Sequence, residues 1–69
     1  MWKVIYVASH PDRLRRLTQA LDEAGVAWRT RRVGGVQAGA DEVMVLDGEL
    51  AEAQAVLARV IAEDAGPKR

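Results

Sequence analysis

The chain has 69 residues, with ten basic and ten acidic side chains, one histidine and no cysteine. A chain this short forms one domain and buries only about 60% of the surface that its unfolded form exposes. With no cysteine and a single histidine, disulfides are excluded and a structural metal site is disfavoured, so self-association is the expected source of additional stability. A formal charge of zero argues against a nonspecific polyanion-binding protein.

The beginning of the chain and its apolar segments bear on location. No apolar segment approaches the roughly 20 residues that a membrane-spanning helix needs. Met1 leads directly into an apolar run, without the basic, hydrophobic and cleavage regions of a signal peptide. These features predict a cytoplasmic protein of bacterial type with no membrane partner.

Charge is unevenly distributed along the chain. Residues 1–35 carry seven basic and three acidic side chains, and residues 36–69 carry three basic and seven acidic ones. The two halves either neutralise each other within the fold or form opposed patches that suit contacts between molecules. Because the domain is small, we expect neutralisation within one molecule.

The stretch WKVIYVASHPD, residues 2–12, predicts a strand followed by the start of a helix. Both alternating sets of side chains in the strand are mostly apolar, as in a strand covered on both faces. The spacing of Ser9 and Asp12 is that of a capping box, and Pro11 suits a first turn. We therefore expect Ser9 to cap a helix that begins at residue 10 or 11.

This first helix is expected to end near Ala24. One apolar stripe recurs at three- and four-residue intervals and consists of Leu14, Leu17, Leu21 and Ala24. Gly25 stands where a left-handed residue commonly closes a helix.

Two further strands are expected in the middle of the chain. Residues 26–33 (VAWRTRRV) mix arginines with valine, tryptophan and threonine, which indicates a strand at the rim of a sheet. The glycine-containing stretch 34–40 is too short for a crossover helix, so the next strand should return antiparallel. Residues 42–46 (EVMVL) suit the centre of the sheet.

A second helix is expected over about 48–64, with Asp47 as its cap and Glu49 in its first turn. Its predicted core face consists of Leu50, Ala53, Val56, Leu57, Val60 and Ile61. The opposite face carries Ala51, Ala55, Ala58 and Ala62. Such a stripe either lets another helix approach closely or reflects the high helix propensity of alanine.

These elements predict an α+β fold of order β-α-β-β-α. A right-handed crossover and a central third strand give a three-stranded sheet of order 1-3-2, with both helices on one face. This is a ferredoxin-like unit without its fourth strand. The domain spans residues 1–65 and a C-terminal tail spans 66–69.

One face of this sheet is left without helices, and the outer edge of the first strand is left without a neighbour. Exposed apolar faces and edges favour association with a second chain. We therefore predict a homodimer through that face or that edge, and a different protein partner stays open. The candidate interface residues are Trp2, Val4, Tyr6, Trp28 and Met44.

Several segments together resemble a known family. They are the opening V-I-Y-V-A strand, the leucine helix ending in Glu23-Ala24-Gly25-Val26, the glycine-bearing hairpin, and Val43-Met44-Val45 followed by Glu52-Ala53 and Leu57. Over nearly the whole chain this layout resembles the small bacterial domains of unknown function that are labelled prokaryotic signal-transducing proteins, which are distantly similar in fold to PII regulators. The resemblance implies an α+β domain of unassigned biochemical role, with regulation as one expectation, and it carries over no catalytic or ligand-binding residue.

A candidate anion site lies at the junction between the first strand and the first helix. Its residues are Ser9, His10, Arg13 and Arg16. The free N–H groups and the dipole of a helix start attract phosphate-sized anions. The alternative is that these arginines pair with carboxylates on and around the same helix.

A second candidate is nucleic-acid binding by Trp2, Tyr6 and Trp28 together with Arg29, Arg31 and Arg32. Aromatic and basic side chains on a sheet can stack single-stranded bases. The zero net charge and the missing RNP-type aromatic pattern argue against it, and packing explains the same aromatics.

Residues for catalysis do not assemble in the sequence. The hydroxyl side chains have only His10 as a base, and Lys3 and Lys68 are the only lysines. We expect no catalytic residue, no metal and no cofactor. The function predicted from sequence is a non-enzymatic interaction or regulatory module acting as a homodimer, with nucleic-acid or phosphorylated-ligand binding as the alternative.

Overall fold

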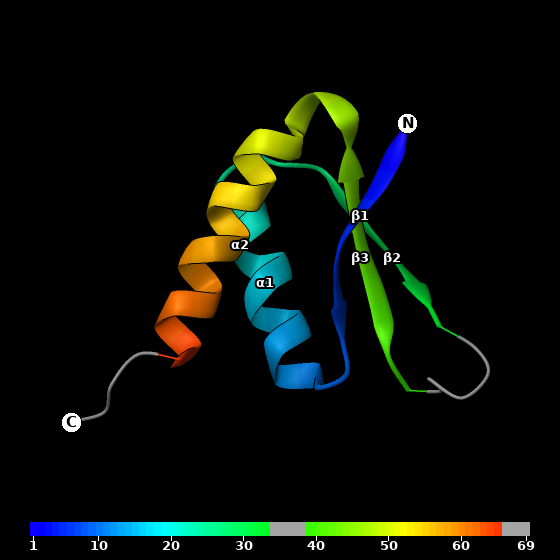
Figure 1. Ribbon diagram of the computed structural model, residues 1–69, viewed down its shortest axis with the longest axis vertical. Coiled ribbons are helices and arrows are strands. Elements are labelled where there is room, and N and C mark those ends of the chain that lie inside the picture. Colours follow the sequence, from blue (N-terminus) through cyan, green and yellow to red (C-terminus); the bar gives the residue numbers. More distant parts are fainter. Residues whose placement is uncertain (34–38, 66–69) are drawn as a thin grey trace.

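The computed structural model describes residues 1–33 and 39–65 (Figure 1). The elements are β1 (Trp2–Ala8), α1 (Pro11–Glu23), β2 (Trp28–Arg32), β3 (Asp41–Leu46), the 3-10 turn η2 (Asp47–Glu49) and α2 (Leu50–Ala65). The sheet has the order β1-β3-β2, and β3 runs antiparallel to both neighbours. This confirms the predicted α+β class and strand order. Most of the predicted glycine connection and the tail 66–69 lie outside the described residues.

Both helices lie on the same face of the sheet, to its left in Figure 1, and they run antiparallel to each other. Between them and the sheet lies one apolar core. Its fully buried large side chains are Leu17, Leu21, Val43 and Val45. The two valines come from alternate positions of β3, so the intervening Met44 points to the face that carries no helix.

The start of α1 differs from the prediction in one detail. The helix begins at Pro11, as expected, but the N-cap position falls on the extended residue His10, which makes no side-chain capping bond. Ser9 therefore stands one residue too early to cap the helix, and Asp12 pairs with Arg15 at 2.7 Å. The end of α1 is as predicted, because Gly25 has a left-handed φ of +75°.

The second helix starts later than predicted. Residues 47–49 form η2, whose cap makes no side-chain hydrogen bond, and α2 begins at Leu50. The carboxylate of Glu49 instead accepts a hydrogen bond from the backbone N–H of Ala27, at 3.1 Å. Ile61 was predicted to lie in the core, but 42% of it is exposed because it flanks the buried stripe.

A β-bulge at Ile5 changes which side chains of β1 reach the core. Val4 pairs with Met44, but the next paired residue is Tyr6, which lies opposite Val43. Ile5 and Tyr6 therefore both pack against the core. For this reason Tyr6, one of the candidate interface residues, does not lie on the helix-free face.

Trp28 also lies on the helix-covered side of the sheet. It pairs with the buried Val45 and packs against the core, and its indole N–H donates to the carboxylate of Asp22 at 2.7 Å. Of the five candidate interface residues, the structure therefore places Trp2, Val4 and Met44 on the helix-free face. We call this surface the open face; by strand register it consists of Trp2, Val4, Val7, Arg29, Arg31, Glu42, Met44 and Leu46.

Candidate functional site

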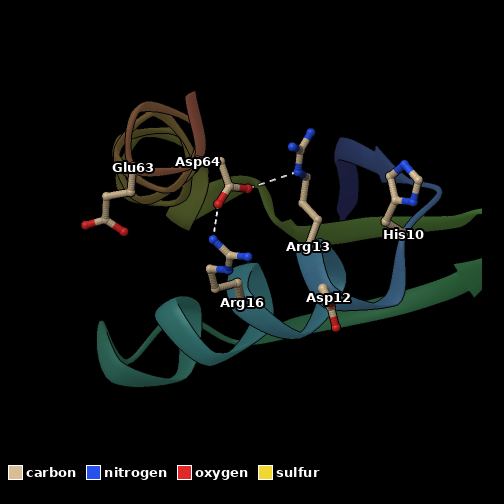
Figure 2. A pocket seen from close by; sticks show the side chains of 6 residues that line it. All are labelled: His10, Asp12, Arg13, Arg16, Glu63 and Asp64. Carbon is tan, nitrogen blue, oxygen red and sulfur yellow. Dashed lines mark hydrogen bonds and ion pairs between the residues drawn. The ribbon is translucent and has the colours of Figure 1, made fainter. Parts of the chain in front are cut away.

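The start of α1 and the end of α2 enclose a hollow of about 400 Å³. Its lining residues, shown in Figure 2, are His10, Asp12, Arg13, Arg16, Glu63 and Asp64. Three of the four residues of the predicted anion site are thus brought together. Ser9 is exposed and does not line the hollow.

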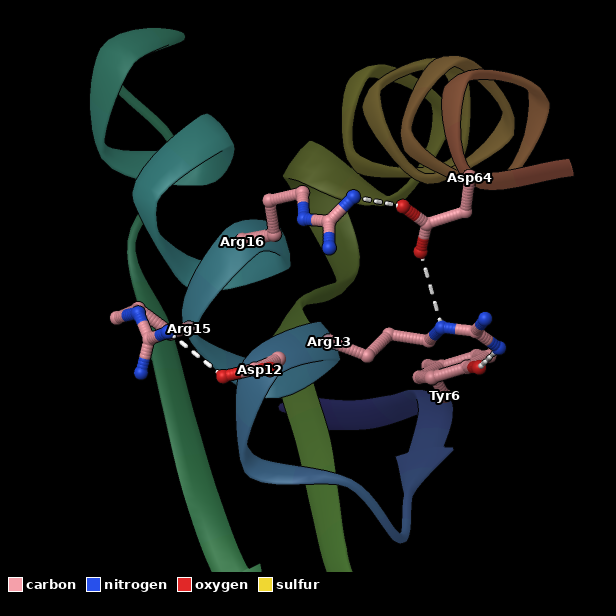
Figure 3. A network of polar contacts seen from close by, with 6 residues as sticks. All are labelled: Tyr6, Asp12, Arg13, Arg15, Arg16 and Asp64. Atoms are coloured by element: carbon pink, nitrogen blue, oxygen red, sulfur yellow. Dashed lines mark hydrogen bonds and ion pairs between the residues drawn. The ribbon is translucent and has the colours of Figure 1, made fainter. Parts of the chain in front are cut away.

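Asp64 is the central residue of this cluster. Its carboxylate accepts a hydrogen bond from Nε of Arg13 at 3.0 Å and another from Nη1 of Arg16 (Figures 2 and 3). Only 8% of its side chain is exposed, against 44% for Arg13 and 54% for Arg16. The carboxylate is therefore held between two guanidinium groups that themselves keep contact with water.

Tyr6 joins the cluster from β1. Nη1 of Arg13 donates a hydrogen bond of 3.1 Å to the tyrosine hydroxyl (Figure 3). This hydrogen bond, together with the charge interactions with Tyr6 and Asp64, raises the pKa of Arg13 above its ordinary value. Through its contacts with Tyr6 and Asp64, Arg13 links β1, α1 and α2.

The cluster also explains the charges at the ends of both helices. Arg13 and Arg16 lie near the start of α1, whereas Glu63 and Asp64 lie in the last turn of α2, and each placement opposes the dipole of its own helix. Because the helices are antiparallel, the start of α1 lies beside the end of α2 (Figure 1). Each set of charges therefore compensates the dipole of the neighbouring helix.

This arrangement bears directly on the predicted anion site. The hollow contains two arginines and three carboxylates, so with a neutral His10 its side chains carry a formal charge of −1. The two arginines already hold a carboxylate from within the chain. The cluster thus favours a structural role in joining the helices over capture of an external anion.

The sequence prediction named the arginines of this cluster and missed Asp64. Its position was readable, because Asp64 continues the spacing of the buried Ala53 and Val60 and so lies on the face of α2 that meets the core. An acidic residue that continues a core stripe, at the end of a helix where its charge is unfavourable, indicates a basic partner on a neighbouring element.

A second hollow, of about 490 Å³, lies on the open face. Its lining residues are Met1, Trp2, Val4, Arg29, Thr30, Arg31 and Met44. The guanidinium of Arg29 lies over the ring of Trp2, 4.6 Å from its centroid. Met44 lies in the middle of the open face and is only 8% exposed. The stacked side chains of Arg29 and Trp2 therefore cover this part of the face.

The arginines of β2 are paired with carboxylates of β3. Nη2 of Arg31 lies 2.6 Å from Oε1 of Glu42, and Nε of Arg32 lies 2.9 Å from Oδ1 of Asp41. The aromatics of the nucleic-acid hypothesis are separated, because Trp2 lies on the open face and Tyr6 and Trp28 lie on the other. A continuous base-stacking surface is therefore not formed.

Ion pairs between the two halves of the chain are the rule. Among the residues that the structure describes, five of six ion pairs join a basic residue before position 36 to an acidic residue after it. The predicted neutralisation of the halves within one molecule is confirmed.

Within residues 1–33 and 39–65, no group of three or more potential metal ligands is arranged to hold an ion. In the same ranges, no helix has both the length and the apolar character needed to cross a membrane. A scan against protein-family models found no match, and searches of the curated proteins and of the solved structures found none either. The resemblance to signal-transducing domains therefore stays a prediction from sequence.

Proposed function

We propose that this chain is a non-enzymatic interaction module, of a regulatory kind, that works as a homodimer. The proposal rests on the position of the exposed apolar side chains. On the open face, Val4 and Val7 are each 46% exposed, and Met1, which precedes β1, is 82% exposed. All three lie on or beside β1, at one side of a small domain whose core is marginal by itself.

The charged groups of the described residues support a role without catalysis. The arginines that line the two hollows are held by Asp64, by Glu42 and by the ring of Trp2. A catalytic group needs a poised acid, base or nucleophile next to space for a substrate. Here the arginines of both hollows, and Asp64 in the first, are engaged in joining elements of the fold.

Binding of nucleic acid or of a phosphorylated ligand ranks below self-association for the same reason. An anion at Arg13 and Arg16 would have to replace Asp64, and one at Arg31 and Arg32 would have to replace the β3 carboxylates; each replacement breaks contacts that join elements of the fold. The alternative predicts salt-sensitive binding of a labelled oligonucleotide that weakens in Arg31→Ala/Arg32→Ala.

Self-association is tested by measuring the mass in solution over a series of concentrations, using light scattering after gel filtration. We expect a mass that rises toward twice the 7.5 kDa of one chain, together with a melting temperature that rises with protein concentration. A mass that stays at one chain up to the highest soluble concentration contradicts the proposal.

A further inference from the structure

The two edges of the sheet carry very different side chains. β2 has the sequence WRTRR, with three arginines among five residues, so pairing it with its own copy would place cations close together. β1 has the sequence WKVIYVA, with Lys3 as its one charged residue. Charged side chains commonly prevent two sheet edges from pairing, and in this sheet most of the edge charges are on β2.

The bulge at Ile5 gives β1 a symmetric pattern of side-chain directions. The open-face residues of β1 are Trp2, Val4 and Val7, and those directed to the helix side are Lys3, Ile5, Tyr6 and Ala8. Over Lys3–Ala8 the pattern reads the same in both directions from the midpoint between Ile5 and Tyr6, and Trp2 lies outside this symmetric part. Without the bulge, Val4 and Val7 would point to opposite faces of the sheet.

This symmetry matches the requirement of a twofold dimer. In an antiparallel pair, side chains directly opposite each other lie on the same face of the sheet. When two copies of β1 pair about the midpoint, Val4 lies opposite Val7 of the second copy, and both are open-face residues. In the same register Ile5 lies opposite Tyr6 of the second copy, and both are directed to the helices.

We infer that the outer edge of β1 is the surface that binds a second copy of the chain, in the antiparallel register that places Val4 opposite Val7. The inference rests on the proposed self-association and specifies its surface. Two three-stranded sheets then form one six-stranded sheet, with both helix pairs on the same side and the arginine-rich β2 strands at its two outer edges.

The exposed apolar side chains fit this arrangement. Val4 and Val7, each 46% exposed in the single chain, come into contact with one another across the new strand pair. The twofold axis also keeps Lys3 away from its own copy, because Lys3 lies opposite Ala8 of the second copy. The six paired residues of each copy, Lys3–Ala8, bury less area than a standard interface, so we expect a weak and reversible dimer.

The register is tested by cysteine crosslinking in the full chain, which contains no cysteine of its own. Val4→Cys and Val7→Cys are purified separately, mixed, and oxidised mildly. We expect a disulfide-linked dimer in the mixture and much less in either variant alone, because only the mixed pair lies directly opposite and close enough for a disulfide. Thr30→Cys on β2, mixed with Val4→Cys, is the matched control and should stay uncrosslinked.

A second measurement separates edge pairing from stacking of the two open faces. Edge pairing protects the β1 amides on the side away from β3, so hydrogen exchange should be slow along the whole strand at high protein concentration. In face stacking, the outward-directed amides would exchange as fast as those of a free edge. The double variant Arg31→Glu/Glu42→Arg alters the open face and keeps the ion pair, so it should not change the crosslinking yield.

The outcomes are distinguishable. Mixed crosslinks together with protection along all of β1 support the inference. A dimer that lacks the mixed crosslink, or that leaves the outer amides of β1 unprotected, overturns the edge inference and leaves self-association standing. A mass of one chain at every concentration overturns both.

Discussion

The two edge strands, β1 and β2, flank the same central strand but meet solvent in different ways. On β2, Arg31 and Arg32 reach across to carboxylates of β3, and Arg29 stacks on Trp2. On β1, the side chains that reach solvent on the open face include the apolar Val4 and Val7, each 46% exposed. One edge of the sheet is thus protected by charge and the other is left able to pair.

The proposed contact with a second chain involves only one strand of the sheet. The centre of the open face is closed by the Trp2–Arg29 stack over Met44, so that face does not need a full additional layer. The uncovered apolar surface is concentrated at β1. A small domain can therefore satisfy most of its surface internally and still present one strand for association.

The largest expected effect comes from adding charge to β1. In Val4→Lys/Val7→Lys, lysines from the two copies oppose each other across the proposed strand pair, so the dissociation constant should rise by at least about tenfold, or about 1.4 kcal/mol. The measurement is sedimentation velocity over a range of concentrations. Thr30→Lys, which adds a cation to β2, is the control and should leave the dissociation constant unchanged. Equal weakening by both changes would remove the distinction between the edges.

The two tryptophans provide the next comparison, in folding stability. Trp28→Ala should lower the free energy of unfolding by about 2–3 kcal/mol, because it removes a side chain that packs on the core and leaves Asp22 without its indole donor. Trp2→Ala should cost about 1 kcal/mol, since it mainly removes the stack with Arg29. Urea unfolding followed by circular dichroism measures both. A larger loss for Trp2→Ala would show that β1 is anchored mainly through the open face.

A smaller loss of stability is expected for Asp64→Asn, which separates structural pairing from anion binding. The change removes the carboxylate between Arg13 and Arg16, so the melting temperature should fall by less than in Trp28→Ala. Arg13 and Arg16 are then left without that carboxylate, and added phosphate should stabilise the variant more than the wild type. Asp12→Asn is the matched control, because it removes the same charge from the hollow but leaves Asp64 between the two arginines. Strong stabilisation of the wild type by phosphate would restore the anion-site hypothesis.

Much of the fold was predictable because hydrophobic period and glycine positions are local signals. The apolar set Leu14, Leu17 and Leu21 and the left-handed Gly25 located α1, and the apolar run of β3 located the centre of the sheet. The face of the sheet on which Tyr6 lies was not predictable from the alternation of side chains along a strand. A single bulge at Ile5 reverses that alternation, and no sequence pattern indicates the bulge.

The candidate site was only half predictable for a related reason. Arg13 and Arg16 are separated by three residues on one helix, so their proximity follows from the sequence. Asp64 lies 48 residues beyond Arg16 and meets it only because α1 and α2 pack antiparallel. The sequence showed charges at the ends of both helices that are unfavourable for the dipole of their own helix. Because the helices pack antiparallel, each set of charges is favourable for the dipole of the other helix.

The pairing of β1 with a second β1 is tested most directly by nuclear Overhauser contacts between labelled and unlabelled copies. In a sample mixed from isotope-labelled and unlabelled chains, we predict intermolecular contacts between the methyl groups of Val4 and Val7. Intermolecular contacts that involve Arg29 or Met44 and spare the β1 valines would contradict the pairing, as would a concentrated sample that shows none.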